Sequence, residues 1–496
     1  MNSIRQLITF YSSVIDSEMF KETLLGFTRN EMKLYEAIFL KGGQSEREIE
    51  FMIYGRNANT LSKKYLILKS RFKEKILNKL SLVDFGEKHV IHRSSKLIEL
   101  YNDLYLAKLL ESRDLKIIGT EQVRRNLISG IQYSLSEIQL ISIRSLIRYS
   151  ALSSDEKHLN ELILQQKAVY NKYRVELFAE NMYWVMISKV QKSKILDESL
   201  IRYVNINYIK IRDMVCRNRS RKSEYYLYRI GFIYYQLTQN YSQILNICSR
   251  FEKLLGSEKS FEKESILVEI SLFRIKALNL LSKIKTGLLI ASKNENIFLK
   301  GSFNWYSYNE QYLLLAMKSK NWILSWTIYF EAVKHDRFKT HSTYIQHTWL
   351  LMGTYLQFMD NRAGFSSFNS DNFLMLESVF DSDKVGFIVS QKIIQILYLS
   401  VDNQVELLDY KMESLRVFVL RNINKSKSER TFYFVKILRK LIDSIIKDKK
   451  IVKISSEIEI LRNSKLNSPS NYYNMEIIPY ELLLNHLVGL FKFSIV

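Results

Sequence analysis

The chain alternates between segments in which apolar residues recur every three or four positions and short polar segments that separate them. In residues 61–80 the apolar positions are four, three, four, four and four residues apart, and they are Leu61, Tyr65, Leu68, Phe72, Ile76 and Leu80. This spacing places the side chains on one face of an α-helix. We therefore expect an amphipathic helix here, with Asn59 or Thr60 capping its first turn.

A shorter helix is predicted immediately before it. Ser45 is followed three residues later by Glu48, which is the spacing of a capping box, where each side chain bonds the other residue's backbone amide. The polar run 55–60 then separates the two helices. Residues 81–93 fit either a short hairpin about Gly86 or a loop, and the pattern does not separate these two interpretations.

Helical pairs follow one another from about residue 120 onward. The pattern predicts hairpins over 224–255, 262–292 and 305–334, a fourth that begins near 342, and a later pair that breaks at 400–403. We expect Ser223 to cap the first of these hairpins, residues 238–240 to form its turn, and residues 318–321 to form the turn of the third. Successive hairpins begin about 35–45 residues apart, which is the range of helical-repeat proteins, in which each hairpin buries its apolar face against its neighbours.

Composition supports the same fold class. The 496 residues include only 2 Pro and 15 Gly, whereas β-sandwiches, barrels and dinucleotide-binding sheets need many Gly and Pro turns. We therefore predict an all-α protein of stacked antiparallel helical hairpins. A polar stretch at 111–122 is the best candidate for a boundary between an N-terminal helical module, residues 1–115, and a repeat array, residues 120–496.

Two hairpins resemble a degenerate tetratricopeptide repeat. Residues 228–234 contain Gly231 and are followed by Tyr241, and Ala316 is likewise followed by Trp322. In that family a small residue in the first helix lets the second helix pack closely, and an aromatic residue opens the second helix. The resemblance implies an α-solenoid with a concave surface that binds a protein or peptide. The spacing between helices is irregular, and the family's usual Ala and Pro of the second helix are absent.

Residues 45–80 resemble the helix-turn-helix of bacterial regulators, in which a capped helix, a tight turn and a second helix present polar residues to DNA. The resemblance implies that the second helix faces DNA through Asn57, Asn59, Thr60, Lys63 and Lys64, with Lys64, Arg71 and Lys75 along one flank. An ordinary helical hairpin produces the same pattern, so both interpretations stand.

The formal net charge of +22 is concentrated in three segments. Residues 56–79 hold eight basic and one acidic side chain, residues 202–229 hold eight and two, and residues 415–453 hold twelve and three. Such clusters suit an anionic partner, although a codon bias toward lysine would give a solvated basic surface with no function. The predicted nucleic-acid- or anion-binding residues are Asn59, Thr60, Lys63, Lys64, Arg71, Lys75, Arg217, Arg219, Arg221 and Lys222. If they bind one partner, they should share one face.

Tyrosines beside the basic run 217–222 admit two interpretations. Basic and aromatic side chains together bind single-stranded nucleic acid, but at helical spacing tyrosine rings more often fill a core between helices. The tyrosines are Tyr225, Tyr226, Tyr228, Tyr234 and Tyr235. We expect the run 217–222 itself to form an exposed turn between helices.

Motifs for catalysis and cofactors are missing. The sequence has no phosphate-binding loop, dinucleotide fingerprint, nucleophile elbow or zinc-protease motif. His89 and His92 are expected at the surface, and His341 and His347 would lie on opposite sides of a helix, so no metal site is predicted. Cys216 and Cys248 cannot build a disulfide framework, and no membrane helix or leader is evident, so a cytoplasmic protein is expected.

The function predicted from the sequence is therefore non-enzymatic, without a cofactor. The first hypothesis is a helical-repeat scaffold that binds a protein or peptide along the array. The alternative is a DNA-binding regulator that uses the N-terminal helices, with the array as its sensor or partner-binding part. Salt dependence separates the two, because phosphate contacts release counterions and make DNA affinity fall steeply with salt.

Overall fold

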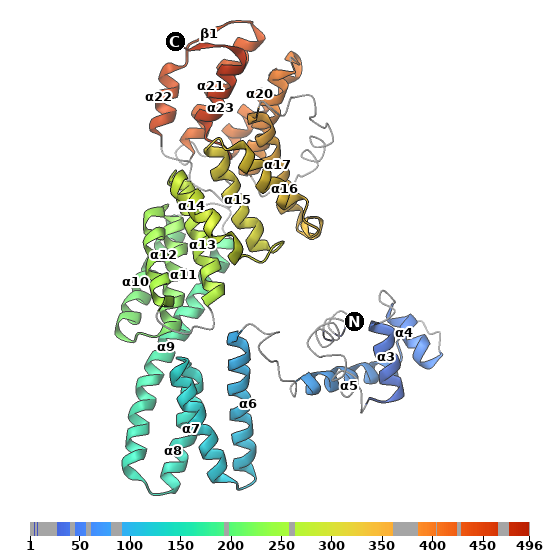
Figure 1. The fold of residues 1–496 in the computed structure, drawn as a ribbon, viewed down its shortest axis with the longest axis vertical. Coiled ribbons are helices and arrows are strands. Elements are labelled where there is room, and N and C mark those ends of the chain that lie inside the picture. Colours follow the sequence, from blue (N-terminus) through green and yellow to red (C-terminus); the bar gives the residue numbers. More distant parts are fainter. Residues whose placement is uncertain are drawn as a thin grey trace. The chain divides into compact units, whose positions relative to one another are not determined.

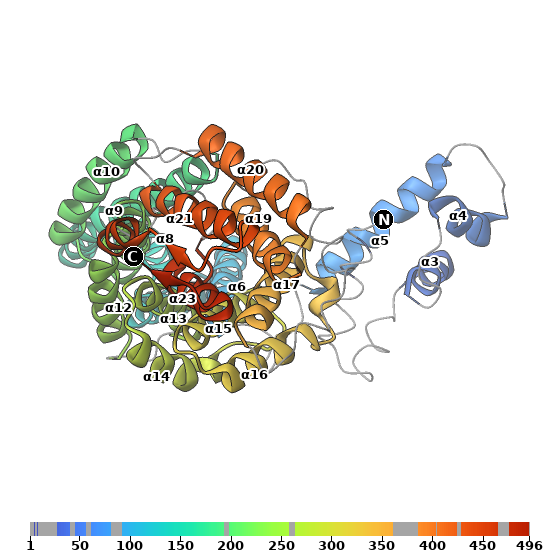
Figure 2. The same cartoon turned by 90° about the horizontal axis from the view of Figure 1, so that it is seen from above.

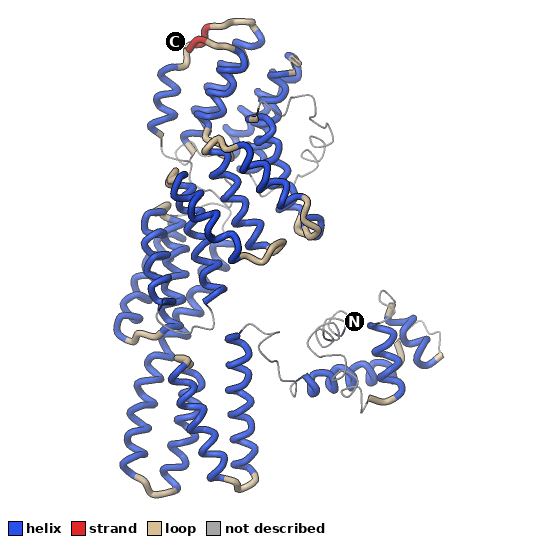
Figure 3. Tube along the Cα trace, viewed as in Figure 1, coloured by secondary structure: helices blue, strands red, loops and turns tan. Residues whose placement is uncertain are grey.

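The computed structural model describes residues 4, 7, 27–39, 45–55, 61–80, 92–192, 198–256, 263–360, 385–402, 404–423, 428–464 and 476–495 (Figure 1). Helices make up nearly all of this part of the chain, as Figure 3 shows, and the predicted all-α class is confirmed. Two strands of two residues each, β1 (Ile451–Val452) and β2 (Ser494–Ile495), form a parallel pair. The chain divides into two compact units, Met1–Val123 and Arg124–Val496, and the boundary falls within one helix.

The first unit contains a small core built by three helices. These are α3 (Arg29–Phe39), α4 (Glu46–Tyr54) and α5 (Lys63–Leu80), and the unit continues through α6 (His92–Ser112) into α7 (Lys116–Gln132). The stripe predicted on residues 61–80 faces this core, because Tyr65, Phe72 and Ile76 are almost fully buried. The predicted capping box is confirmed at the start of α4. The residue expected to cap the first turn of α5, Asn59 or Thr60, was wrong: the helix begins at Lys63, and the hydroxyl of Ser62 accepts from the Tyr65 amide at 3.2 Å.

The second unit is a succession of helices that pack against their neighbours in the sequence. Their bounds are α8 (Ser136–Leu152), α9 (Glu156–Lys192), α10 (Glu198–Arg217), α11 (Arg221–Leu237), α12 (Tyr241–Gly256), α13 (Lys263–Leu280), α14 (Ile284–Asn294), α15 (Phe303–Lys318), α16 (Trp322–Val333), α17 (Thr343–Met359), α19 (Val385–Val401), α20 (Val405–Asn422), α21 (Glu429–Ile446), α22 (Ser455–Asn463) and α23 (Tyr480–Phe491), with 3₁₀ turns η1 (Glu295–Ile297) and η2 (Phe338–Thr340). The five predicted hairpin positions coincide with these helices. One detail was wrong: α11 begins earlier than expected, and Ser220 caps it, with Ser223 as the third residue of the capping box.

Three-residue turns of one kind join six of the described helix pairs. The middle residue of each turn has a left-handed backbone, with φ between 53° and 60°, and these residues are Asp114, Ser134, Ser154, Gln239, Ser282 and Lys320. In the turn at Gln239, for example, the Asn240 amide donates to the Tyr235 carbonyl at 2.8 Å, which closes a Schellman motif. Glycine is the usual residue here, so its absence hides the repeat of this turn from sequence analysis.

The second unit is built in two layers around its inner helices. α13 and α15 lie on the inner side, and α12, α14 and α16 lie outside them (Figure 2). α11 packs against α9, α10 and α12, and its Arg229 reaches Glu269 of α13. The two layers pack closely at Gly231 of α11, where an added Cβ atom would come within 2.7 Å of the Ile247 side chain of α12. The aromatic residues Tyr241 and Trp322 open α12 and α16, as predicted.

Candidate partner-binding surface

The predicted DNA-binding residues of the first unit lie mainly along α5. Lys63, Lys64 and Arg71 are exposed, whereas Asn57, Asn59 and Thr60 lie outside the described residues. Lys75 is half-buried, and its Nζ lies 2.8 Å from the carboxylate of Glu31 on α3, so this lysine links two helices of the core. The connection between α4 and α5 spans residues 55–62, which is longer than the three- to four-residue turn of a helix-turn-helix.

The predicted basic run 217–222 forms the turn between α10 and α11. Arg217 is exposed at the end of α10. Two of the other cations have carboxylate partners within the second unit: Arg219 lies 2.7 Å from Glu224, and Lys222 lies 2.8 Å from Glu180 of α9. Arg221 is half-buried in the first turn of α11. Because this run and α5 belong to different units, the hypothesis that they share one face stays a prediction.

The tyrosines beside this run belong to the core, as the second interpretation proposed. Tyr226 is buried and its hydroxyl donates to Glu180 at 2.8 Å. The rings of Tyr225 and Tyr228 pack against Phe251 of α12. These rings therefore hold α11 against α9 and α12, and they do not form an open stacking platform.

A row of half-buried charged side chains crosses the inner helices of the second unit, and we call it the inner polar row. It begins at Arg229 of α11, whose Nε donates to Glu269 of α13 at 2.8 Å. The guanidinium also lies over the ring of Tyr183, with its Cζ 4.2 Å from the ring centroid. Burial raises the pKa of Glu269, and the charge of Arg229 opposes that shift. The pair is thus only partly accessible to water.

The middle of the row is a lysine and a glutamate whose charges interact across α13 and α15. Burial raises the pKa of Glu310 to about 7, although the charge of Lys276 opposes the shift. Burial likewise lowers the pKa of Lys276, against the charge of Glu310. Both side chains are half-buried. Removing ionised groups from water costs free energy, so this pair of charges lowers the stability of the fold.

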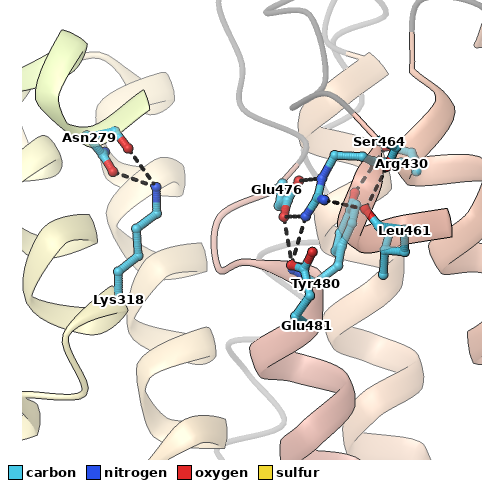
Figure 4. Close-up of polar contacts among 9 residues, drawn as sticks. Asn279, Lys318, Arg430, Leu461, Ser464, Glu476, Tyr480 and Glu481 are labelled. Atoms are coloured by element: carbon cyan, nitrogen blue, oxygen red, sulfur yellow. Dashed lines mark hydrogen bonds and ion pairs between the residues drawn. The ribbon is translucent and has the colours of Figure 1, made fainter. Parts of the chain in front are cut away.

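The row ends at Lys318, the last residue of α15. Its Nζ donates to the side-chain oxygen of Asn279 at 2.6 Å and to the Asn279 carbonyl at 3.2 Å, and the Asn279 amide donates to Gln311 at 2.9 Å. Burial lowers the pKa of Lys318 to about 8. The negative charge of Glu476 opposes this shift, and the positive charge of Arg430 adds to it. Figure 4 shows Lys318 and Asn279 on one side of the view and the cluster around Arg430 on the other.

Arg430, in the first turn of α21, organises that buried cluster. Its guanidinium makes two bonds to Glu476, of 3.1 and 2.7 Å, one to Glu481 of α23 at 2.8 Å and one to the Leu461 carbonyl at 2.7 Å (Figure 4). Burial opposes the charged form, but the hydrogen bonds that Arg430 donates to Glu476 and Glu481 raise the pKa of Arg430. The arginine is 4% exposed, so this part of the third basic segment is structural.

The inner polar row could not be predicted from the sequence. Arg229, Glu269 and Lys276 each stand between apolar neighbours in the sequence, and only the packing of α11, α13 and α15 brings the row together. One signal was available in the sequence: Glu269, Lys276 and Asn279 are seven and three residues apart, a spacing that places polar side chains on one face of α13.

The described residues contain no group of three or more His, Cys, Asp or Glu side chains that could hold a metal ion. Among the described helices, none combines the length and the apolar character needed to cross a bilayer. No protein-family model, no curated protein and no solved structure matches the chain.

Proposed function

We propose that this protein is a non-enzymatic helical-repeat scaffold that binds a protein or peptide segment along the inner helices of its second unit. The observation that carries the proposal is the inner polar row, which places charged and amide side chains on three consecutive inner helices. In an array of tetratricopeptide-like hairpins, the first helix of each hairpin lines the binding surface. α11, α13 and α15 hold that place in their hairpins.

The energetics of the row support a binding role. Replacing a buried ion pair with apolar or neutral groups of similar size is often neutral or stabilising, so folding alone does not explain Lys276 and Glu310. Half-buried charges with shifted pKa values concentrate at functional sites. A partner segment with amide and charged groups would form hydrogen bonds and ion pairs with these half-buried charges. Its affinity would be increased because the packed helices already hold the side chains in place.

The test exchanges Lys276 for methionine and Glu310 for glutamine together, which removes both charges and keeps the net charge and the approximate volume. We expect the double variant to fold with equal or higher thermal stability and to lose at least tenfold in affinity for its partner. Partners come from a pull-down with the full chain in an extract of its native cells, with and without nuclease, and each affinity is then measured with the purified partner.

A matched control removes another lysine–glutamate pair on the same unit. Lys300 and Glu331 are 2.7 Å apart, and Lys300 is 63% exposed, so Lys300→Met with Glu331→Gln changes the same charges away from the inner row. The control should bind normally. Equal binding by both double variants, or partners that are recovered only without nuclease, would contradict the scaffold proposal.

The second candidate function is DNA binding by the first unit. The observation that favours it is the exposed face of α5, where Lys63, Lys64 and Arg71 stand on a compact three-helix core. If α5 contacts phosphates, Lys64→Ala should weaken binding to a mixed-sequence duplex and reduce the slope of log K against log salt by about 0.9. Lys33→Ala, at an exposed position of α3, is the control. Gel retardation at several salt concentrations measures both, and a chain that retards no duplex at low salt excludes this function.

A further inference from the structure

The longest of the described helices, α9 (Figure 1), presents a line of large apolar side chains to solvent. They are Ile163, Tyr170, Leu177 and Trp184, and they are 46%, 54%, 38% and 54% exposed. Each lies seven residues after the one before, so the line follows one face of the helix for about 32 Å. We call these four residues the α9 row. Single exposed apolar residues are ordinary, but a continuous line of them indicates an interaction surface.

The other face of α9 supplies its packing within the second unit. α9 packs against α8, α10 and α11, and its buried apolar residues are Leu162, Val169, Val175, Ala179, Tyr183 and Met186. Each residue of the α9 row lies outside this buried set. The row therefore takes no part in holding α9 in place, and its apolar character is not explained by the fold.

Two cations lie in the same line as the α9 row. Lys167 and Arg174 each follow an apolar residue of the row by four positions, which places them on the same side of the helix. Both are exposed, and within the described part of the chain neither makes an ion pair with a carboxylate. The single acidic residue of the stretch 163–177, Glu176, is buried and accepts a hydrogen bond from Ser136 at 2.8 Å. The surface thus combines apolar side chains with positive charge.

A second helix is the partner that this spacing fits. Apolar residues that recur every seven positions form the seam along which two α-helices pack, and the two helices then wind around each other with a left-handed twist. A partner helix with apolar residues at the same spacing would cover the α9 row. Acidic residues beside its seam would lie next to Lys167 and Arg174 and complement their charge.

A second copy of α9 does not complement these charges. Two antiparallel copies that align Ile163 with Trp184 have their two-fold axis between residues 173 and 174, which brings the two Arg174 side chains together. Two parallel copies place each cation of the line beside its counterpart. Like charges at such positions are destabilising, so the occupant is an acidic segment of a different protein.

We propose that the α9 row is a docking surface for an acidic amphipathic helix of a protein partner. The apolar seam of that helix packs on the four side chains of the row, and carboxylates beside the seam pair with Lys167 and Arg174. This surface shares no residue with the inner polar row. It is therefore independent of the proposed scaffold function, and either proposal can fail without the other.

Designed peptides of four heptads, about 28 residues, test the proposal on the full chain. The acidic peptide carries leucine at both seam positions of each heptad and glutamate on either side, where the glutamates also prevent it from pairing with itself. We expect a dissociation constant below about 0.1 mM at an ionic strength of about 0.15 M, which screens non-specific attraction. A peptide with lysine in place of glutamate, and one with serine in place of leucine, should each bind at least tenfold more weakly by calorimetry.

Two double variants assign the binding to the α9 row. Tyr170→Ser with Leu177→Ser interrupts the apolar line and should abolish binding of the acidic peptide. Lys167→Glu with Arg174→Glu should weaken the acidic peptide at least tenfold and make the lysine peptide the tighter ligand. All four side chains are exposed, so both variants should fold, which circular dichroism and the unfolding temperature verify.

Two further variants are matched controls. Lys285 and Lys293 are exposed on α14, so Lys285→Glu with Lys293→Glu makes the same change in net charge away from α9. This variant should bind the acidic peptide as tightly as the unmodified chain. The inner-row variant, Lys276→Met with Glu310→Gln, should also bind the peptide normally, whether or not it loses a partner of its own. A failure of the scaffold proposal is thereby distinguished from a failure of this one.

The proposal is overturned if the acidic peptide does not bind, or if the charge variants of α9 and α14 weaken its binding equally. A thymidine oligonucleotide and vesicles of phosphatidylserine and phosphatidylcholine are titrated in parallel as anionic probes of other classes. If either binds more tightly than the peptide and loses that binding in the Lys167→Glu, Arg174→Glu variant, the surface serves nucleic acid or membrane instead, which also overturns the proposal.

Discussion

Replacing Arg430 with alanine is expected to destabilise the second unit by about 3–5 kcal/mol, because it leaves buried acidic groups without their cation. Glu476 is 6% exposed and receives two of its hydrogen bonds from Arg430, at 3.1 and 2.7 Å. The Leu461 carbonyl would also lose its donor. The effect should appear as a fall of about 4–6 °C in the unfolding temperature, because a unit of this size unfolds with an entropy of about 0.8 kcal/mol per kelvin.

Tryptophan fluorescence measures this loss in the second unit alone. All five tryptophans of the chain, Trp184, Trp305, Trp322, Trp326 and Trp349, lie in that unit. Lys436→Ala is the control on the same helix, since Lys436 is 59% exposed and its Nζ lies 3.3 Å from Glu457. Glu457 is buried but keeps Lys440 as a second cation at 2.5 Å, so the control should lose no more than about 1 kcal/mol. A loss below about 1 kcal/mol for Arg430→Ala would show that the cluster is not buried as described.

Replacing Gly353 with leucine is expected to cost about 3 kcal/mol, the upper part of the usual range for overpacking a core. Gly353 lies within α17, and an added Cβ atom would come within 2.4 Å of the ring of Tyr329 on α16. That ring packs between Trp326 and Trp349, with centroid distances of 5.7 and 6.3 Å, so it has little room to move. Burial raises the pKa of Tyr329 to about 12, in agreement with a confined ring.

A double variant and a second glycine make the prediction specific to this contact. Adding Tyr329→Ala to Gly353→Leu should restore part of the lost stability, because the new side chain can occupy the space of the ring. Gly489→Ala, in α23, should instead stabilise by about 0.5–1 kcal/mol, since alanine is the better helix former and nothing lies near its Cβ position. Additive effects of Gly353→Leu and Tyr329→Ala in urea unfolding would refute the steric explanation.

The helices were predictable because their cause is local. The stripe of residues 61–80 and the capping box at Ser45 are spacing patterns, and a spacing of three and four residues has one structural solution when prolines are almost absent. The aromatic residues that open α12 and α16, and the turns at 238–240 and 318–321, were identified for the same reason. The start of α11 was misplaced because Ser220 and Ser223 both suit a cap, and only the backbone geometry selects Ser220.

The partners of individual charges were not predictable. Lys75 was expected to face an anionic ligand, yet its ammonium group meets Glu31, which is 44 residues away in the sequence. Lys222 similarly meets Glu180. A basic run in a sequence shows how many cations are present, but the distances that decide which cation is neutralised arise only when separate helices pack together.

The sequence by itself determined that this chain forms amphipathic helices, where several of them begin and end, and that several pair as hairpins, because periodicity and caps act over a few residues. The tertiary structure decided what the helices do together. It placed Arg229, Lys276 and Lys318 in one inner row, and it joined Arg430 to Glu476 and Glu481 in a buried cluster. These features depend on contacts between residues 30 or more positions apart, and no local pattern in the chain encodes such contacts.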